Sequence, residues 1–530
     1  MTTQRADRGM TTAPHHLAAE VGRDVLAAGG SAVEASVAMA ATLAVVYPHM
    51  TGIGGDGFWL VHEPDGQVRA IHGCGRAAAA ADLGLYGGLK EIPTRGGLAA
   101  NTVAGTVSAW AAVLAASGSR WPLEELLAPA IRLARSGVPA TAGGAQVARD
   151  KGPELRAQPG AYAEVFEPEG RPLREGDVLK QPRLADTLEA LARDGPDSFY
   201  RGELAAAMAA DLAALGSPLA PADLADHQAE TPTPLRRRAL GAELFNTAPP
   251  TQGLTSLMIL ALFERLGAGT SGAFDHVHGL VEATKQAFLV RDGLLGDPAG
   301  MPRAAQDLLD DDRALDEMAA RISPQRALPW PHRGPAGDTT WFAAADVRGQ
   351  VVSAIQSTYF EFGSGLVLPQ TGVVWQNRGS SFRLGADGPN ALRPGRQPFH
   401  TLNPALARFD DGRLMAYGTM GGEGQPQTQA AIFTRYACLG MDLQEAISAP
   451  RWLLGRTWGQ ATTTLKLEDG FTPDLISALR AAGHDVEVLP RLSAAMGHAG
   501  AIVRHPHGVF EGASDPRSDG AAVGVQETSG

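Results

Sequence analysis

Apolar residues recur at three- and four-residue intervals in several segments of the first half of the chain, which is the spacing of helices with one buried face. The pattern predicts helices over residues 16–28, 31–46, 123–135, 184–193, 203–215 and 254–266. Ser31, with Glu34 three residues later, indicates a capping box at the start of the second helix. A strand over 58–62 and a turn at Asp65-Gly66 interrupt the pattern. Residues 120–330 are expected to be mostly helical.

The apolar period changes to two after residue 339. This change predicts strands over 340–345, 351–357, 365–368, 372–376, 406–409 and 414–418, followed by a helix over 429–438. Four prolines between residues 323 and 337 oppose both helix and central strand, so this segment is expected to be an exposed linker. Strand-rich blocks at both ends, with helices between them, indicate sheets that are covered by helices.

The composition is that of an ordinary globular protein of 530 residues, with 44% hydrophobic and 19% charged residues. A net charge of −12, and no basic stripe beyond a short run at 236–238, argue against nucleic-acid binding. The two cysteines, Cys74 and Cys438, exclude a disulfide framework and a cysteine zinc site. Neither a secretory signal nor an apolar run of about twenty residues is visible, so a cytoplasmic protein that does not bind membranes is expected.

Residues 337–341, Gly-Asp-Thr-Thr-Trp, lie where the proline-rich linker meets the first of the later strands. A cut between Asp338 and Thr339 would give Thr339 a free α-amino group beside its own hydroxyl, so one residue would carry both a nucleophile and a base. An α-amino group has a pKa of about 7.7–8.0, which leaves a useful fraction unprotonated at neutral pH. The alternative is a threonine that only begins a strand.

Two glycine-rich segments, 418–424 and 52–57, are candidates for ligand binding. Segment 418–424 lies between a predicted strand and a predicted helix, where Gly421 and Gly422 could direct their amides at an oxyanion; the alternative is a plain tight turn. Segment 52–57 matches the dinucleotide-binding fingerprint by letter. It follows a helix and opens a strand, however, which reverses the order that the fingerprint requires. We expect segment 52–57 to pack against the core.

Other polar residues are weaker candidates by themselves. Arg378 follows a predicted strand and could hold a carboxylate through two parallel hydrogen bonds. Ser357 could orient the amine of Thr339 or merely end a strand. His276 and His278 are two residues apart, a weak metal pattern without clear carboxylate partners. No metal and no cofactor are predicted.

Five motifs, in order over nearly the whole chain, resemble the γ-glutamyltranspeptidase family: 30–35 (Gly-Ser-Ala-Val-Glu-Ala), 47–55 (Tyr-Pro-His-Met-Thr-Gly-Ile-Gly-Gly), 338–340 (Asp-Thr-Thr), 362–365 (Phe-Gly-Ser-Gly) and 418–422 (Gly-Thr-Met-Gly-Gly). The resemblance implies an α+β N-terminal-nucleophile hydrolase with a four-layer αββα sandwich. It also implies self-cleavage into a large subunit, 1–338, and a small subunit, 339–530, which stay associated and could form a homodimer of heterodimers. By position, Thr339 matches the nucleophile, Ser357 the residue that contacts its amine, and Gly421 and Gly422 the oxyanion glycines.

The residues that hold the amino-acid head of a γ-glutamyl substrate in this family are changed here. At those positions of the small subunit this chain has Tyr359, Arg378, Ser381, His400 and Thr401. The family's large-subunit arginine falls near Cys74, with Arg76 two places away, and the segment 382–400 is too short for the lid loop of many members. Nothing obvious remains to receive an α-ammonium group, whereas Arg378 and His400 add cationic character.

The predicted substrate is therefore a small acidic amide. Segments 356–365 and 375–379 are similar to the oxamate amidohydrolase branch of the family, which hydrolyses oxamate to oxalate and ammonia in purine (allantoin) nitrogen use. The predicted function is a self-processing N-terminal-threonine amidohydrolase that works through an acyl-enzyme. The alternatives are a γ-glutamyl hydrolase or transpeptidase acting on glutathione-type substrates, a glutaryl-cephalosporin-type acylase, an uncleaved inactive scaffold, and, more weakly, a nucleotide-dependent oxidoreductase.

Overall fold

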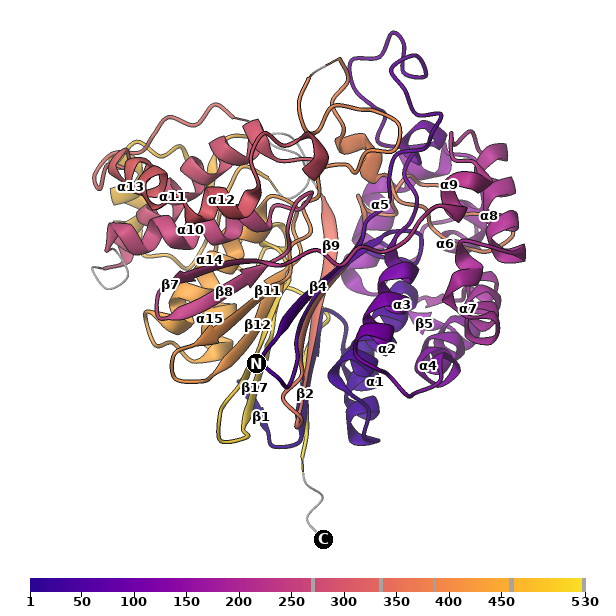
Figure 1. Cartoon of the computed structure of the whole chain (residues 1–530), viewed down its shortest axis with the longest axis horizontal. Helices are drawn as coiled ribbons and strands as arrows, with labels where there is room; N and C mark the ends of the chain where they lie inside the picture. The colour runs from indigo at the N-terminus through magenta and orange to yellow at the C-terminus, as the bar shows by residue number, and fades with distance from the viewer. Residues whose placement is uncertain (268–271, 333–336, 386, 457–461, 527–530) are drawn as a thin grey trace.

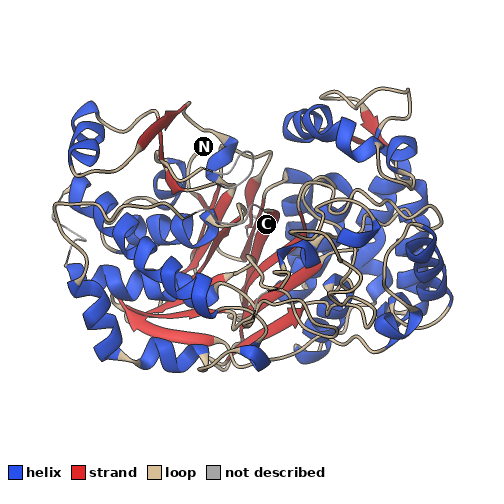
Figure 2. Ribbon diagram, turned by 90° about the horizontal axis from the view of Figure 1, so that it is seen from above, coloured by secondary structure: helices blue, strands red, loops and turns tan. Residues whose placement is uncertain are grey.

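Two antiparallel sheets lie face to face at the centre of the molecule, and helices cover the outer face of each (Figures 1 and 2). The computed structural model describes residues 1–267, 272–332, 337–385, 387–456 and 462–526. Its four layers confirm the predicted αββα sandwich. Among the described helices, none combines the length and the apolar character that crossing a membrane requires.

The six-stranded sheet has the order β18-β2-β9-β10-β3-β4. Its strands are β2 (Gly9–Ala13), β3 (Asp56–His62), β4 (Val68–Gly73), β9 (Asp338–Asp346), β10 (Val351–Tyr359) and β18 (Ala521–Val525). The helices nearest to it are α1 (His16–Ala27), α2 (Ala32–Val46) and α3 (Thr106–Ala116). Behind them lie α4 (Leu123–Ser136), α5 (Ala142–Arg156), α6 (Tyr162–Phe166), α7 (Pro182–Asp194), α8 (Glu203–Ala214) and α9 (Pro221–Ala225) (Figure 1).

The seven-stranded sheet has the order β1-β17-β16-β12-β11-β8-β7. Its strands are β1 (Gln4–Ala6), β7 (Leu235–Ala239), β8 (Ala242–Asn246), β11 (Ala405–Phe409), β12 (Leu414–Thr419), β16 (Ala499–Arg504) and β17 (Phe510–Ser514). Its helices include α10 (Gly253–Leu266), α11 (Ala273–Leu294), α12 (Ala305–Asp310), α13 (Asp312–Ala320), α14 (Gly424–Ala437) and α15 (Leu443–Ser448). A small sheet beside them contains β13 (Trp452–Leu454), β14 (Leu465–Glu468) and β15 (Val486–Leu489), with α16 (Pro473–Ala481) between the last two.

Both large sheets combine strands from the two sides of the Asp338–Thr339 bond. In the six-stranded sheet β9 pairs with β2 and β10 pairs with β3. In the seven-stranded sheet β11 pairs with β8 and β17 pairs with β1. A cut at this bond would therefore leave the two parts joined by backbone hydrogen bonds in both sheets.

Strand β9 is buried on both faces, and its alternation fixes the position of its first residues. Trp341 belongs to the apolar cluster between the sheets, whereas Phe342 belongs to the cluster under the helices. The Trp341 ring lies against Gly418 and Gly500 of the opposite sheet, where an added Cβ would come within 2.3 Å and 2.6 Å of the ring. Its Nε1 donates to Ser353 Oγ at 3.0 Å. The absence of two side chains thus makes room for the indole.

Most predicted elements are confirmed, including the helices α1, α2, α4, α7, α8 and α10 and the Ser31–Glu34 capping box. The predictions of strands over 365–368 and 372–376 were wrong, because only an isolated bridge joins Val367 and Val374. The hairpin β7–β8 lies inside the region expected to be mostly helical. Helix α14 begins at Gly424, five residues before the predicted start, since Pro426 is tolerated in a first helical turn. The linker has no regular structure over 323–332, and residues 333–336 lie outside the described part.

We expect Gly418→Ala to lower the free energy of unfolding by about 1–3 kcal/mol, because the new methyl group would overlap the Trp341 ring. Urea unfolding followed by tryptophan fluorescence measures the change. Gly143→Ala in α5 is the matched control, since its Cβ would meet nothing within 4 Å and alanine favours helix. Equal stability of the two variants would contradict the close packing of the sheets at Trp341.

Candidate active site

The hydroxyl of Thr339 lies against the carbonyl group of the bond that is predicted to be cut. Thr339 is the second residue of β9 and has no exposed surface. Its Oγ1 donates a hydrogen bond to the Asp338 carbonyl oxygen at 2.5 Å, and its backbone N donates to Asp338 Oδ1 at 2.9 Å. These contacts are those of the continuous chain, with the bond between the two residues intact.

Ser357 contacts the same carbonyl oxygen from the neighbouring strand. Its Oγ donates to the Asp338 oxygen and accepts a hydrogen bond from Tyr359 N at 2.7 Å. A register shift in β10 between Gln356 and Tyr359 places Tyr359 opposite Asp338, with φ at +84°, a value that non-glycine residues rarely adopt. Ser357 therefore polarises the Asp338 carbonyl group. Its contact with the Thr339 amine stays a prediction.

The guanidinium of Arg378 is buried near the junction without an acidic partner. Arg378 has no exposed surface, and its guanidinium carbon lies over the Tyr359 ring, 3.6 Å from the centroid. Both Nη atoms are 3.4 Å from Thr401 Oγ1, which makes two long hydrogen bonds. Within the described ranges Arg378 forms no ion pair, and its Nε has no hydrogen-bond partner.

Burial lowers the pKa of Arg378 to about 10, so the group remains a cation at neutral pH. A buried charge without a partner is unfavourable unless a ligand supplies the opposite charge. The stacking on Tyr359 offsets part of this cost, because the face of an aromatic ring attracts a cation. The positive charge of Arg378 therefore favours the binding of an anion beside it.

Sequence analysis counted His400 as a second cation, and this was wrong. His400 is fully buried, and its burial together with the Arg378 charge lowers its pKa well below 6.5. The neutral ring lies with Nε2 2.7 Å from Asp56 Oδ2, and Nε2 donates to this oxygen when Asp56 is ionised. Its Nδ1 is left as an acceptor without a partner among the described residues. The cationic character belongs to Arg378.

Asp56 is a residue of the site that sequence analysis missed. Besides His400, it accepts hydrogen bonds from Gly75 N at 3.1 Å, Gly105 N at 3.0 Å and Gln376 Nε2 at 3.1 Å. Burial raises the pKa of its carboxyl to about 7, against the opposing effect of these hydrogen bonds and of the Arg378 charge. The sequence feature that could have pointed to Asp56 is its place as the acidic residue inside the glycine-rich segment 52–57.

That segment packs against the core as predicted. A Cβ at Gly54 would lie 2.2 Å from the Val374 carbonyl oxygen, and one at Gly55 would lie 2.1 Å from the Ser357 carbonyl oxygen. Only glycine fits at these two positions. The close approach places Asp56, the first residue of β3, beside the strand that carries Ser357.

Gly421 and Gly422 form the turn between β12 and α14. Both have positive φ values, 121° and 50°, and their amides donate no hydrogen bond within the part of the chain that is described. Gln252 Nε2 donates to the carbonyl oxygens of Gly422 at 2.8 Å and Thr401 at 2.7 Å, which links this turn to the wall around Arg378. Unpaired amides beside a helix N-terminus suit an oxyanion. The oxyanion role stays a prediction.

Ser381 and Arg76 make contacts of a different kind. Ser381 Oγ donates to the Phe399 carbonyl oxygen at 3.0 Å, which fastens the segment that leads to His400. Arg76 is half-exposed and pairs with Glu230 at 2.6 Å. Neither contact brings a charge toward Thr339, and the substrate contact predicted for Ser381 remains untested.

Two groups of buried side chains have the composition of metal sites: Asp56, Cys74 and His400, and His278, Glu282 and His484. In the first group, the Asp56 oxygens already accept hydrogen bonds, and burial raises the pKa of the Cys74 thiol well above 9. In the second group, Lys285 pairs with Glu282 at 2.7 Å, and His278 bonds to His484 at 2.9 Å. His276 contacts Thr434 instead of converging with His278. Both sets are arranged as hydrogen-bond networks.

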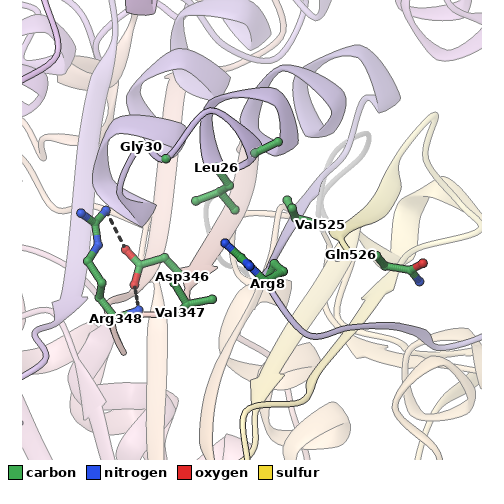
Figure 3. A pocket seen from close by; sticks show the side chains of 10 residues that line it. Arg8, Leu26, Gly30, Asp346, Val347, Arg348, Val525 and Gln526 are labelled. Atoms are coloured by element: carbon green, nitrogen blue, oxygen red, sulfur yellow. Dashed lines mark hydrogen bonds and ion pairs between the residues drawn. The ribbon is translucent and has the colours of Figure 1, made fainter. Parts of the chain in front are cut away.

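Two cavities flank the ends of β9. One, of about 470 Å³, reaches Asp338 and Glu361 at the junction. The other, of about 360 Å³, lies at the opposite end around Asp346 (Figure 3). There Asp346 Oδ2 accepts from Ala32 N at 3.0 Å and lies 3.5 Å from Arg348, so these contacts fasten the β9–β10 turn to the start of α2. The second cavity contains none of the candidate site residues.

A family model and two relatives match nearly the whole length of the chain. The family model described as gamma-glutamyltranspeptidase matches residues 18–525. The chain is 53% identical over 520 residues to the oxamate amidohydrolase proenzyme of Klebsiella pneumoniae, an alignment that covers 97% of this chain and 98% of the relative. It is 41% identical over 519 residues to the glutathione hydrolase-like YwrD proenzyme of Bacillus subtilis, with the same coverage of 97% and 98%.

The crystal structure of cephalosporin acylase from Bacillus halodurans has the same fold. It matches with a TM-score of 0.91 at 33% identity and covers 100% of this chain and 98% of the other. The family model, the proenzyme relatives and the shared αββα sandwich point to one enzyme class. The chain belongs to the γ-glutamyltranspeptidase family and is an amidohydrolase of the N-terminal-nucleophile class.

Proposed function

We propose that this chain is a proenzyme that cuts itself between Asp338 and Thr339, and that the new N-terminal threonine hydrolyses a small amide bearing a carboxylate, with oxamate as the best candidate. The observation that carries the substrate class is the buried Arg378 guanidinium, which forms no ion pair with any residue that the structure describes. Oxamate joins an amide and a carboxylate on adjacent carbons, which are the two groups that Thr339 and Arg378 would engage. The name of the Klebsiella relative supports this choice.

Self-cleavage is supported by the contacts at the junction and by the proenzyme relatives. The Thr339 hydroxyl would attack the Asp338 carbonyl, whose oxygen Ser357 already contacts. An ester would form by an N-to-O shift, and water would hydrolyse it. The products would be a large subunit, 1–338, and a small subunit, 339–530, held together because each sheet contains strands of both.

In turnover, the α-amino group of Thr339 would take the proton of the threonine hydroxyl as it attacks the substrate amide. The amides of Gly421 and Gly422 would stabilise the oxyanion, and removal of one such donor typically slows catalysis by roughly 100- to 1,000-fold. The amino group would then return the proton to the departing ammonia. Water would hydrolyse the acyl-enzyme and release oxalate.

Arg378 would hold the substrate carboxylate through two parallel hydrogen bonds, with Tyr359 as the platform beneath it and Thr401 at its edge. The family's large-subunit arginine falls near Cys74 in the sequence, and the Cys74 sulfur lies within 4.8 Å of ligand atoms of Asp56 and His400. Arg378 would thus supply, from the small subunit, the cation that other members supply from the large one. His400 would offer a neutral acceptor.

A γ-glutamyl substrate is the competing proposal, supported by the glutathione hydrolase-like relative. Such a substrate carries an α-ammonium group that needs an acidic partner. Asp56 is the acidic group facing Arg378, and its oxygens are engaged by His400 and two backbone amides. This arrangement favours the acidic amide.

Replacing Thr339 with alanine should leave a single polypeptide and reduce amidase activity to background, because the nucleophile of both reactions is gone. Denaturing gels and mass spectrometry of the purified protein check this, and the wild-type small subunit should begin at Thr339. Thr340→Ala is the control: its hydroxyl bonds to the Gln356 carbonyl oxygen at 3.0 Å, and the variant should still cut. Cleavage of the Thr339→Ala chain at the same bond would refute the proposal.

Arg378→Gln should lower kcat/KM for oxamate by about 10- to 100-fold, because charge-assisted hydrogen bonds contribute about 1.5–3 kcal/mol. Oxamide, which has an amide in place of the carboxylate, is the neutral comparison. The variant should lose the preference for oxamate over oxamide, as measured by ammonia release. Arg76→Gln removes a half-exposed arginine and should change neither rate appreciably. An unchanged preference in Arg378→Gln would remove the argument for an acidic substrate.

A further inference from the structure

The side chain of Asp338 contacts the nitrogen of the peptide bond that self-cleavage must break. Asp338 Oδ1 lies 2.9 Å from Thr339 N, and the Asp338 side chain is buried, with 2% of the residue exposed. When the carbon–nitrogen bond breaks, that nitrogen must gain a proton to leave as an amine. Thr339 Oγ1 and Ser357 Oγ both contact the carbonyl oxygen. Among the described residues, the Asp338 carboxyl, whose Oδ1 accepts the hydrogen bond of Thr339 N, is therefore the ionisable group that contacts the leaving atom.

A second carboxyl group stands near the first. Glu361, two residues beyond the end of β10, is 7% exposed and lines the same cavity of about 470 Å³ as Asp338. Burial, and then the negative charge of Glu361, raise the pKa of Asp338 well above its usual 3.8. Arg95 Nη2 lies 3.8 Å from Glu361 Oε2. The pair thus keeps a proton on Asp338 where an exposed aspartate would have lost it.

We propose that Asp338 is the general acid for cleavage of its own peptide bond and that Glu361 is the positioning residue that keeps Asp338 protonated. This inference rests on the self-cleavage proposed above. Asp338 would thus provide both the carbonyl carbon that Thr339 attacks and the acid that protonates the leaving nitrogen. A general acid in hydrogen-bond contact with the reacting atom contributes typically 10²- to 10⁴-fold in rate.

The Asp338 carboxyl alone can transfer the proton that the reaction moves from the threonine oxygen to the nitrogen. Thr339 Oγ1 bonds to the Asp338 carbonyl carbon, and its proton moves to the carbonyl oxygen with which it is already hydrogen-bonded. The carbon–nitrogen bond then breaks, the Asp338 carboxyl gives its proton to the nitrogen, and the carboxylate recovers the proton from the oxygen as the ester carbonyl forms. The threonine oxygen has lost one proton, the amine has gained one, and Asp338 is restored.

The cavity offers a route for the water of the second step. Water adds to the ester carbonyl, the carbon–Oγ1 bond breaks, and the threonine oxygen takes one proton while the new carboxyl group keeps the hydroxyl. Asp338 and Glu361 both line this cavity, so it reaches the junction. The other ionisable groups on its wall, which any pH dependence must also reflect, are Tyr47, Asp150, Lys151, His498, Arg517 and Asp519.

Pulse-labelled cell-free synthesis, followed by transfer to buffers between pH 5 and pH 10, tests the proposal on the full chain, with the cut fraction read from denaturing gels. Because the protonated carboxyl is the active form, the wild-type rate should be constant at low pH and fall as pH rises through the Asp338 pKa. Asp338→Asn keeps an acceptor for Thr339 N but has no acidic proton. It should cut about 10²- to 10⁴-fold more slowly, without that fall.

Two further variants separate chemistry from structure. Glu361→Gln removes the neighbouring negative charge, so the pKa of Asp338 should drop and the fall in rate should move to lower pH. Asp338→Glu restores an acid and should recover part of the rate. Asp150→Asn changes an exposed carboxyl on the same cavity wall and should cut like the wild type.

Each outcome decides one question. An Asp338→Asn chain that cuts at the wild-type rate with the wild-type pH profile overturns the inference and leaves the proposed function standing. A wild-type chain that never cuts overturns the proposed function itself. If near-ultraviolet circular dichroism shows Asp338→Asn to be unfolded, the Glu361→Gln profile decides, and an unshifted profile overturns the inference.

Discussion

The first residues of β9 are held between two sheets, and the chemistry of the site depends on that constraint. Trp341 is fixed by the missing side chains of Gly418 and Gly500 on one sheet and by its hydrogen bond to Ser353 on the other. Trp341 anchors the start of β9 in this way, and the Thr339 hydroxyl, two residues earlier, lies against the Asp338 carbonyl oxygen. Strands from both sides of the Asp338–Thr339 bond are hydrogen-bonded in each sheet. Cleavage of this bond would therefore leave the two parts of the chain associated.

Burial acts on the charged groups near Thr339 in different ways, because their ordinary pKa values differ. Asp338 and His400 are pushed toward their neutral forms, whereas Arg378 remains a cation since even its lowered pKa is about 10. Loss of solvent thus favours a protonated carboxyl at the junction, whereas the positive charge of Arg378 persists in spite of it. The first suits cleavage of a peptide bond, and the second suits the binding of an anion.

Helices such as α4 and α7 could be predicted from the sequence because each has one buried face that is set by local spacing. The strands β9 and β10 are buried on both faces, and the change of period after residue 339 predicted them. The hairpin β7–β8 was missed because its strands are five residues each and β7 stands at the edge of the sheet, where the pattern is weak. The segments near Val367 and Val374 have strand-like composition and share backbone hydrogen bonds, but they form an isolated bridge instead of two strands.

The sequence by itself determined the family motifs, the Asp338-Thr339 pair at the start of a strand and the arginine at position 378, because each is a matter of residue type and local order. Only the tertiary structure decided that Asp56 faces His400, that His400 is neutral, that Arg378 has no ion pair among the described residues and that Asp338 contacts the nitrogen of the peptide bond that follows it. The reason is physical. The charge state of a group and the partner it meets depend on burial and on atoms hundreds of residues away, and neither is present in a local pattern.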